Sequence, residues 1–256
     1  MGDKLLSVII PTKNRSTFLK KCVETFKIFD EIETIVVDDQ SNKVEKEENI
    51  EICSVNQIKY FENTLKKGAP SARNYGASLS NGEYLWFFDD DDYVSEETLI
   101  KLIKILKKDK SDIHLMSMNI INKSKNVVKT VVPLTSKNNY NYYRKKGHQV
   151  NTSCMIFKRE IFNKFKWDID LVSGQDTDLI LRASHRANIN CLGEEYIVNV
   201  VIDHQDRITK NISKQMLGKK QFYKKHKDVL TIQRKFYYLF TYFFRIPYLK
   251  SVIKWK

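Results

Sequence analysis

The sequence has few of the features that mark a secreted, disulfide-stabilised or membrane-spanning protein. It contains only four cysteines in 256 residues, and they stand far apart with no C-x-x-C spacing: Cys22, Cys53, Cys154 and Cys191. We therefore expect reduced, packed thiols and neither a metal knuckle nor a disulfide framework. The first apolar run, Leu5 to Ile10, is too short for the core of a signal peptide. These absences favour the cytoplasm.

Long uncharged runs are also scarce in the basic C-terminal region. The net charge is +13, and residues 207–256 contain 14 Lys and Arg but one acid, so the other residues hold 30 bases and 30 acids. The longest uncharged run there, Phe236 to Phe244, is nine residues, whereas a helix that crosses a bilayer needs about 20. Aromatic residues interleave with the bases, which favours contact with an anionic membrane surface. The alternative is a helix pair that packs on the domain or on a partner subunit.

Apolar segments alternate with helical patterns in the first part of the chain. We expect strands at 5–10, 33–39, 57–63 and 83–88, and helices at 16–29, 71–81 and 95–108. Strands separated by helices predict a mostly parallel α/β sheet with crossover helices. Residues 122–147, rich in Asn, Lys and Tyr, are expected to form a mobile loop.

Polar residues follow three of the expected strands at the point where each ends. Pro11 to Arg15 follow the first strand, Asp38 and Asp39 the second, and Asp89 to Asp92 the fourth. Parallel α/β sheets bind ligands outside the carboxyl ends of their strands. Clustered carboxylates repel one another unless a cation holds them, and hard divalent ions such as Mg²⁺ or Mn²⁺ also bind phosphate oxygens. The sequence therefore predicts one site for a divalent metal and a phosphate-bearing ligand.

Four segments in this order resemble the nucleotide-sugar domain of family 2 glycosyltransferases: SVIIPTKNR, IVVDDQS, FENTLKKGAPSARNYGASLSNGEYLWFFDDDD and WDIDLVSGQDTDLILRASHRA. The resemblance implies the GT-A fold, a Rossmann-like α/β fold with a mixed, mostly parallel sheet flanked by helices. It implies a glycosyltransferase domain at 1–206, with a nucleotide-sugar half at 1–95 and an acceptor half at 96–206. Residues 207–256 would form the basic, aromatic helical tail.

The resemblance also implies roles for individual residues. Asp91 would hold Mn²⁺ or Mg²⁺ together with Asp89 and His204, and Asp92 would follow as an acid that supports the metal ligands or faces the acceptor. Because four acids are adjacent, an offset of the motif by one residue stays open. Asp176 corresponds to the general base, although Gln175 replaces the acid that usually precedes it. The residues expected to bind the nucleotide sugar are Pro11, Thr12, Asn14, Arg15, Asp38, Asp39, Arg73, Asp89 and Asp90.

The implied activity is metal-dependent, inverting transfer of a sugar from a nucleotide sugar, with UDP favoured, to a hydroxyl of a glycan or lipid-linked acceptor. This chemistry would serve cell-surface polysaccharide synthesis, on the inner face of the cell membrane, with homo-oligomerisation open and no nucleic-acid partner. Two other classes stay open. One is a non-catalytic scaffold with the same fold, and the other is a polyanion-binding protein that uses the tail.

The remaining polar residues of interest have structural interpretations. Asp178 and Arg182 are four residues apart, which predicts a salt bridge along one helix. The other histidines are interpreted as structural or surface residues: His114, His148, His185 and His226.

Overall fold

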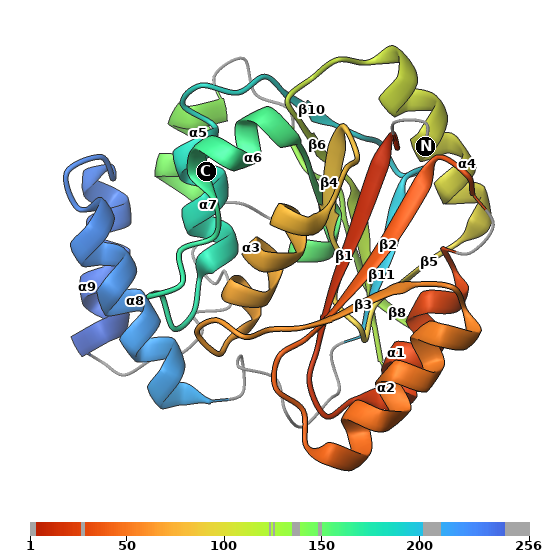
Figure 1. Cartoon of the computed structure of the whole chain (residues 1–256). Helices are drawn as coiled ribbons and strands as arrows, with labels where there is room; N and C mark the ends of the chain where they lie inside the picture. Colours follow the sequence, from red (N-terminus) through yellow and green to blue (C-terminus); the bar gives the residue numbers. More distant parts are fainter. Residues whose placement is uncertain are drawn as a thin grey trace.

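A mixed β-sheet runs through the centre of the molecule (Figure 1). The computed structural model describes residues 4–26, 29–122, 124, 126–134, 139–147, 150–201 and 211–243. The sheet has the strand order β10-β6-β9-β4-β1-β2-β3. Its strands are β1 (Leu6–Thr12), β2 (Ile32–Asp38), β3 (Lys59–Glu62), β4 (Tyr84–Phe87), β6 (Ile113–Leu115), β9 (Met155–Lys158) and β10 (Ile189–Cys191).

The predicted parallel arrangement of the first four strands is confirmed. β1 pairs in parallel with β2 and β4, and β2 pairs in parallel with β3, while β9 runs antiparallel to β4 and β6. All seven residues of β1 are buried, as expected of a central strand covered on both faces. Thr12, the last residue of β1, lies opposite Asp38, the last residue of β2, so these strands end side by side.

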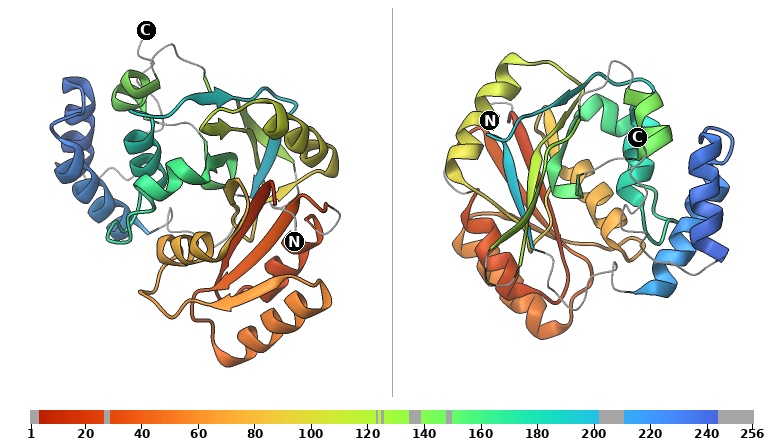
Figure 2. Two further views of the ribbon diagram at one scale, coloured as in Figure 1. Left: turned by 45° about the horizontal axis from the view of Figure 1, so that its top comes forward. Right: turned by 180° about the vertical axis from the view of Figure 1, so that it is seen from behind.

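Crossover helices cover both faces of this sheet (Figures 1 and 2). α1 (Ser16–Glu24) and α2 (Lys43–Val55) pack against each other, and α3 (Ala69–Leu79) lies against β1 and β2. α4 (Glu96–Lys108) begins where predicted, because the Ser95 side chain accepts a hydrogen bond from the Thr98 N–H. α6 (Arg159–Phe165), α7 (Gln175–Ala183) and a short 3₁₀ helix (Thr152–Cys154) complete this region.

The expectation of a mobile loop at 122–147 is wrong for the described part of that stretch. A second sheet, ordered β5-β11-β7-β8, is formed by Tyr93–Val94, Ile197–Val201, Ser117–Ile121 and Val127–Val131. β8 lies at the edge of this sheet, and α5 follows at Asn139–Lys146. The first four residues of β8 are exposed and α5 buries only Tyr143, so neither element has the apolar periodicity that identifies buried elements.

The C-terminal region is helical where it is described, and it packs on the body. α8 (Ile212–His226) and α9 (Ile232–Phe243) form a helix pair at the end of the molecule opposite α1 and α2 (Figures 1 and 2). Tyr238 of α9 is buried and stacks on Phe222 of α8, with 5.1 Å between the ring centroids. Among the described residues, no helix is both long enough and apolar enough to span a membrane.

Candidate active site

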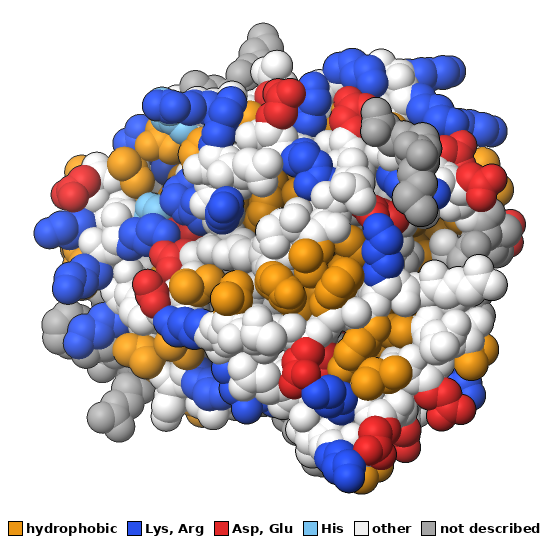
Figure 3. All heavy atoms as spheres, in the orientation of Figure 1, with side chains coloured by type: hydrophobic (Ala, Val, Ile, Leu, Met, Phe, Trp, Pro, Cys, Tyr) orange, Lys and Arg blue, Asp and Glu red, His pale blue; other side chains and the backbone are white. Residues whose placement is uncertain are grey.

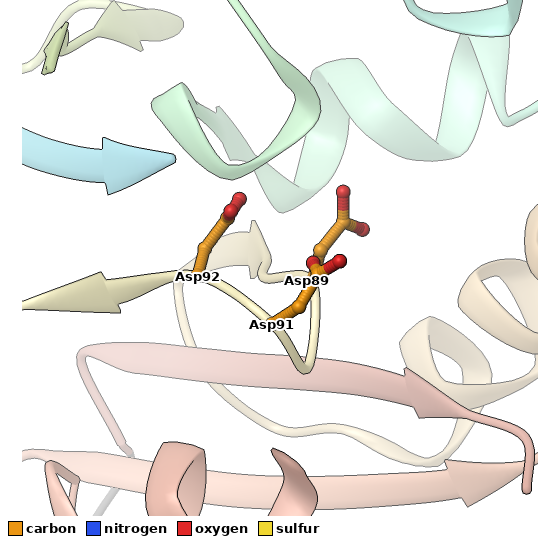
Figure 4. A group of neighbouring side chains, drawn as sticks. All are labelled: Asp89, Asp91 and Asp92. Atoms are coloured by element: carbon orange, nitrogen blue, oxygen red, sulfur yellow. The ribbon is translucent and has the colours of Figure 1, made fainter. Parts of the chain in front are cut away.

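Three of the four consecutive aspartates form one group of carboxylates. The buried aromatic strand β4 leads into the run, which turns back on itself so that the Asp92 N–H donates to the Asp89 carbonyl at 3.1 Å. Carboxylate oxygens of Asp89, Asp91 and Asp92 lie within 4.8 Å of one another. All three side chains project to the same side of the loop, away from β1 and β2 (Figure 4). Such hard oxygen ligands suit Mg²⁺ or Mn²⁺.

Asp90 has a different environment from its three neighbours. Its carboxylate is 5% exposed, accepts a hydrogen bond from Thr12 Oγ1 at 2.8 Å and pairs with Arg15 at 3.0 Å. Arg15 also pairs with Asp91 at 3.2 Å. Burial raises the pKa of Asp90 to about 7, with Arg15 opposing and Asp91 reinforcing the shift. Asp90 therefore joins the acidic run to the end of β1, and Thr12 and Arg15 face this carboxylate.

Arg73 connects α3 to the acidic run. Its guanidinium pairs with Asp89 at 2.5 Å and stacks on Trp167, with 5.0 Å from Cζ to the ring centroid. Both Arg73 and Trp167 are buried. The family resemblance implied that Arg73 would lie near the base or the diphosphate of the nucleotide, and the structure places it beside Asp89 of the carboxylate group.

The two aspartates at the end of β2, Asp38 and Asp39, are held by hydrogen bonds within the protein. Asp38 is fully buried and accepts hydrogen bonds from the side chains of Asn49 at 2.9 Å and Tyr60 at 3.1 Å. Asp39 is 6% exposed, and both of its oxygens accept from the Gly68 N–H at 2.9 Å. These carboxylates fix the turns that border the strand ends.

Asn14 ties the loop after β1 to the loop after β2. Its N–H donates to Ser41 Oγ at 2.8 Å, and its Oδ1 accepts from the Asn42 N–H at 2.8 Å. Asn14 has a φ of 52°, a left-handed conformation that Asn tolerates better than most residues. Pro11, also predicted as a nucleotide-sugar contact, is buried within β1 and lies opposite Val37.

Asp176 lies in the first turn of α7, which begins after Gly174. Gly174 has a φ of 76°, in the left-handed region that favours glycine. The Thr177 N–H donates to Asp176 Oδ1 at 2.7 Å. The Gln175 side chain donates to the Leu171 carbonyl at 2.7 Å, so this residue fixes the segment that precedes the helix. His204, the remaining predicted metal ligand, lies outside the described residues.

Sequence reasoning missed two residues that support the carboxylate group. Ser153 Oγ donates to Asp92 at 2.6 Å and accepts from the Asp89 N–H at 3.0 Å, which holds both ends of the run. Trp167 provides the ring that stacks on Arg73. Each lies more than 60 residues from the run in sequence, and no pattern around either one predicts the contact.

The structural interpretations of the other polar residues are confirmed where they are described. Asp178 pairs with Arg182 along α7, and His226 is buried against Asp178. His114 is fully buried in β6, and His185 packs against Tyr140. His148 lies outside the described residues.

A surface depression of about 260 Å³ lies elsewhere, between α4 and the second sheet. Its lining includes three acids, Glu97, Glu194 and Glu195, and shares no residue with the carboxylate group. Its three acids outnumber its one cation, Lys101, so this depression does not favour a phosphate-bearing ligand.

Solved structures with similar architecture define the fold. The fragment 1–349 of TarS from Staphylococcus aureus, in complex with UDP-GlcNAc, matches 94% of this chain and 72% of its own, with a TM-score of 0.62 and 18% identity. The mannosyltransferase PcManGT from Pyrobaculum calidifontis, in complex with GDP-Man and Mn²⁺, matches 94% of this chain and 70% of its own, with a TM-score of 0.64 and 14% identity. The chain has the GT-A fold of these glycosyltransferases.

The family follows from the sequence comparison. The model of Glycosyl transferase family 2 matches residues 7–165, which is more than half of the chain. The chain belongs to this family and is a glycosyltransferase. It is 27% identical over 249 residues to a protein of Escherichia coli K12 named as a colanic acid biosynthesis glycosyl transferase, WcaA, with coverage of 94% of this chain and 88% of WcaA. Seven further relatives match over only 18% to 41% of their own length.

Proposed function

We propose that the enzyme transfers a sugar from a nucleotide sugar, with UDP favoured, to a hydroxyl of a cell-surface glycan or of its lipid-linked precursor. The observation that carries the proposal is the group of Asp89, Asp91 and Asp92 at the carboxyl end of β4. The similar proteins support the nucleotide-sugar donor, the metal and the polysaccharide role in turn. TarS was solved with UDP-GlcNAc, PcManGT was solved with GDP-Man and Mn²⁺, and WcaA is named for colanic acid biosynthesis.

The carboxylate group would hold the divalent metal, Mn²⁺ or Mg²⁺. When bound, the metal supplies positive charge that stabilises the departing nucleoside diphosphate. Arg73 partly neutralises Asp89, and Arg15 partly neutralises Asp91, so the run can stay folded before the metal arrives. His204 would contribute to the same metal, as the sequence predicts.

The nucleotide would lie along the loops after β1 and β2. Asn14 fixes these two loops to each other, and Asp39 is buried at the second of them, where the nucleobase is expected. The proposed contacts of the nucleotide sugar are Pro11, Thr12, Asn14, Arg15, Asp38, Asp39, Arg73, Asp89 and Asp90.

Asp176 would act as the general base. A carboxylate within hydrogen-bond reach of the acceptor hydroxyl takes its proton as the hydroxyl attacks the anomeric carbon. The bond from that carbon to the diphosphate oxygen breaks in the same displacement, so the configuration of the sugar inverts. Gln175 is neutral and donates a hydrogen bond to the Leu171 carbonyl, so Asp176 is the first acid of α7 and is the residue that corresponds to the base.

A donor panel tests this function. Purified protein is incubated with Mn²⁺ and a set of UDP- and GDP-sugars, and slow donor hydrolysis is followed. Asp176→Asn should keep its affinity for UDP and lose turnover by about 10²-fold or more, the usual contribution of acid–base catalysis. Asp170→Asn, which changes an exposed acid in the preceding segment, is the control. Near-normal turnover in Asp176→Asn would place the base elsewhere, and no hydrolysis of any donor would favour a non-catalytic scaffold.

We also propose that α9 rests on the anionic inner surface of the cell membrane. Ile232, Phe236 and Phe240 follow one another at four-residue spacing, and their exposed fractions are 72%, 67% and 47%. The other face of α9 is buried through Tyr238 and Thr241, so this apolar stripe faces outward. Lys and Arg side chains gather on the side of the molecule where α8 lies (Figure 3). Apolar residues beside a basic surface suit an interfacial helix.

Vesicle sedimentation tests the membrane contact. The full chain should sediment with phosphatidylglycerol vesicles at low salt, and the variant Phe236→Ser with Phe240→Ser should remain in the supernatant with unchanged UDP affinity. The matched control replaces Val127 and Val128, two similarly exposed apolar residues of β8, with serine. If the full chain does not sediment, or if the Phe variant instead dissociates an oligomer, the stripe is not a membrane contact.

A further inference from the structure

A buried carboxylate joins α7 to the C-terminal helix α8. Asp178 is fully buried, and its Oδ1 lies 2.7 Å from both Lys225 Nζ and His226 Nε2. Its Oδ2 accepts from Arg182 Nε at 2.8 Å. Burial alone would raise the pKa of Asp178, but the hydrogen bonds from His226 and Arg182 and the adjacent positive charges lower that pKa well below its ordinary value. Asp178 is therefore a charged group whose partners come from two helices.

α8 also contacts the segment that leads into α7. A Cβ atom added to Gly218 would lie 1.9 Å from Ser173 Oγ and 2.8 Å from the Ser173 backbone N and O, so the helix approaches this backbone as closely as a glycine allows. Gln221 accepts from the Val172 N–H at 2.9 Å and donates to the Asp170 carbonyl at 2.9 Å. Residues 170–173 are thus fixed to α8 in two ways. The α8 backbone at Gly218 packs closely against Ser173, and the Gln221 side chain hydrogen-bonds to the backbone of Asp170 and Val172.

The residues just before this segment are bound by α3. Asn74 donates to the Trp167 carbonyl at 2.9 Å and accepts from the Trp167 N–H at 3.0 Å. Trp167 also stacks on Arg73, which pairs with Asp89 of the carboxylate group. Residues 167–173 are therefore linked to the carboxylate group through Arg73 and to α8 through Gln221.

We infer that Asp178 and Lys225 are positioning residues, through which α8 fixes the first turn of α7 and thereby the carboxylate of Asp176. Asp176 and Asp178 belong to the same helical turn, and the Asp178 N–H donates to the Gly174 carbonyl at 3.0 Å as that turn begins. A displacement of about 1 Å at a reacting group can reduce turnover by about 10²-fold. This inference rests on the proposed role of Asp176 as the general base.

Lys225→Met is the decisive variant, because it removes one cation and keeps the aliphatic stem, while Arg182 and His226 still partner Asp178. It also removes the ion pair of Lys225 with Asp168 at 2.5 Å, which ties α8 to the same stretch before α7. It should lower kcat for hydrolysis of the nucleotide sugar selected in the donor panel by about tenfold, with unchanged KM for that donor and unchanged calorimetric affinity for UDP. Lys225→Arg should restore kcat to within about threefold of wild type. Lys224→Met, which removes the exposed neighbouring lysine, should behave as wild type.

Combination with Asp176→Asn separates positioning from stability. If Lys225 acts through Asp176, Lys225→Met should have little further effect on kcat in the Asp176→Asn background, because residues that act as one unit are non-additive. A lower melting temperature with normal kcat in Lys225→Met would overturn the inference and leave the cluster as a purely stabilising contact. Near-normal turnover in Asp176→Asn alone would instead refute the proposed base.

Discussion

The substitution Asp91→Asn tests whether the acidic run holds a divalent metal. A carboxylate oxygen lies about 2.1 Å from a bound Mg²⁺. At this distance, the loss of one negative charge costs about 4 kcal/mol of attraction to a divalent ion even with the dielectric constant of water. An amide oxygen can still coordinate the ion, which recovers part of this loss. We therefore expect the affinity for Mn²⁺ in the presence of UDP to fall by about 10²- to 10³-fold.

Asp90→Asn is the comparison variant for Mn²⁺ affinity, because it makes the same chemical change one residue away, at a proposed contact of the nucleotide sugar. The Asp90 carboxylate faces Thr12 and Arg15, and it is not part of the group formed by the other three aspartates. Its charge lies farther from the metal, so its loss should weaken Mn²⁺ binding by at most about tenfold.

Titration calorimetry of each variant with Mn²⁺ and UDP measures both affinities, and circular dichroism with thermal melting checks that each variant folds. Unchanged affinity in a folded Asp91→Asn variant would show that the metal does not bind there. Equal losses in the two variants would show that the run acts through its total charge and not through the arrangement of Asp89, Asp91 and Asp92.

Two further predictions concern stability. Gly82→Ala should lower the free energy of unfolding by about 1–3 kcal/mol, because the new Cβ would lie 2.5 Å from the Ser7 backbone N and 2.8 Å from the Leu6 carbonyl carbon. Urea unfolding measures this loss. An unchanged urea midpoint would mean that β1 shifts at little cost in free energy. Burial lowers the pKa of His114 below its ordinary 6.5, so the unfolded chain binds this proton first and stability should fall as the pH drops below about 6.5. By pH 5 the free energy of unfolding should have fallen by at most about 2 kcal/mol through His114. Urea unfolding of His114→Leu should lack this part of the pH dependence. Equal slopes of the free energy of unfolding against pH in the wild type and in His114→Leu would contradict the prediction.

The sequence was most informative where burial is continuous along the chain. β1, β2 and β4 are buried on both faces, so each is a run of apolar residues that ends at polar ones, and their positions were predicted. The carboxyl ends of parallel strands meet at one edge of the sheet, so the sequence also predicted that the acidic run would lie beside the polar residues at the ends of β1 and β2. β8 and α5 were missed because their residues are mostly exposed and carry no such pattern.

The sequence by itself determined the class of the fold, the strand ends that carry polar residues and the family, because these depend on local periodicity and on the order of motifs. Only the tertiary structure decided which of four identical aspartates face one another, since Asp90 turns toward Arg15 while its neighbours group together. It also decided that the basic C-terminal region packs on α7 through Asp178, whose partners Lys225 and His226 lie more than 40 residues away. Such contacts depend on the path of the whole chain, and a charge or an aromatic residue in the sequence does not specify its partner.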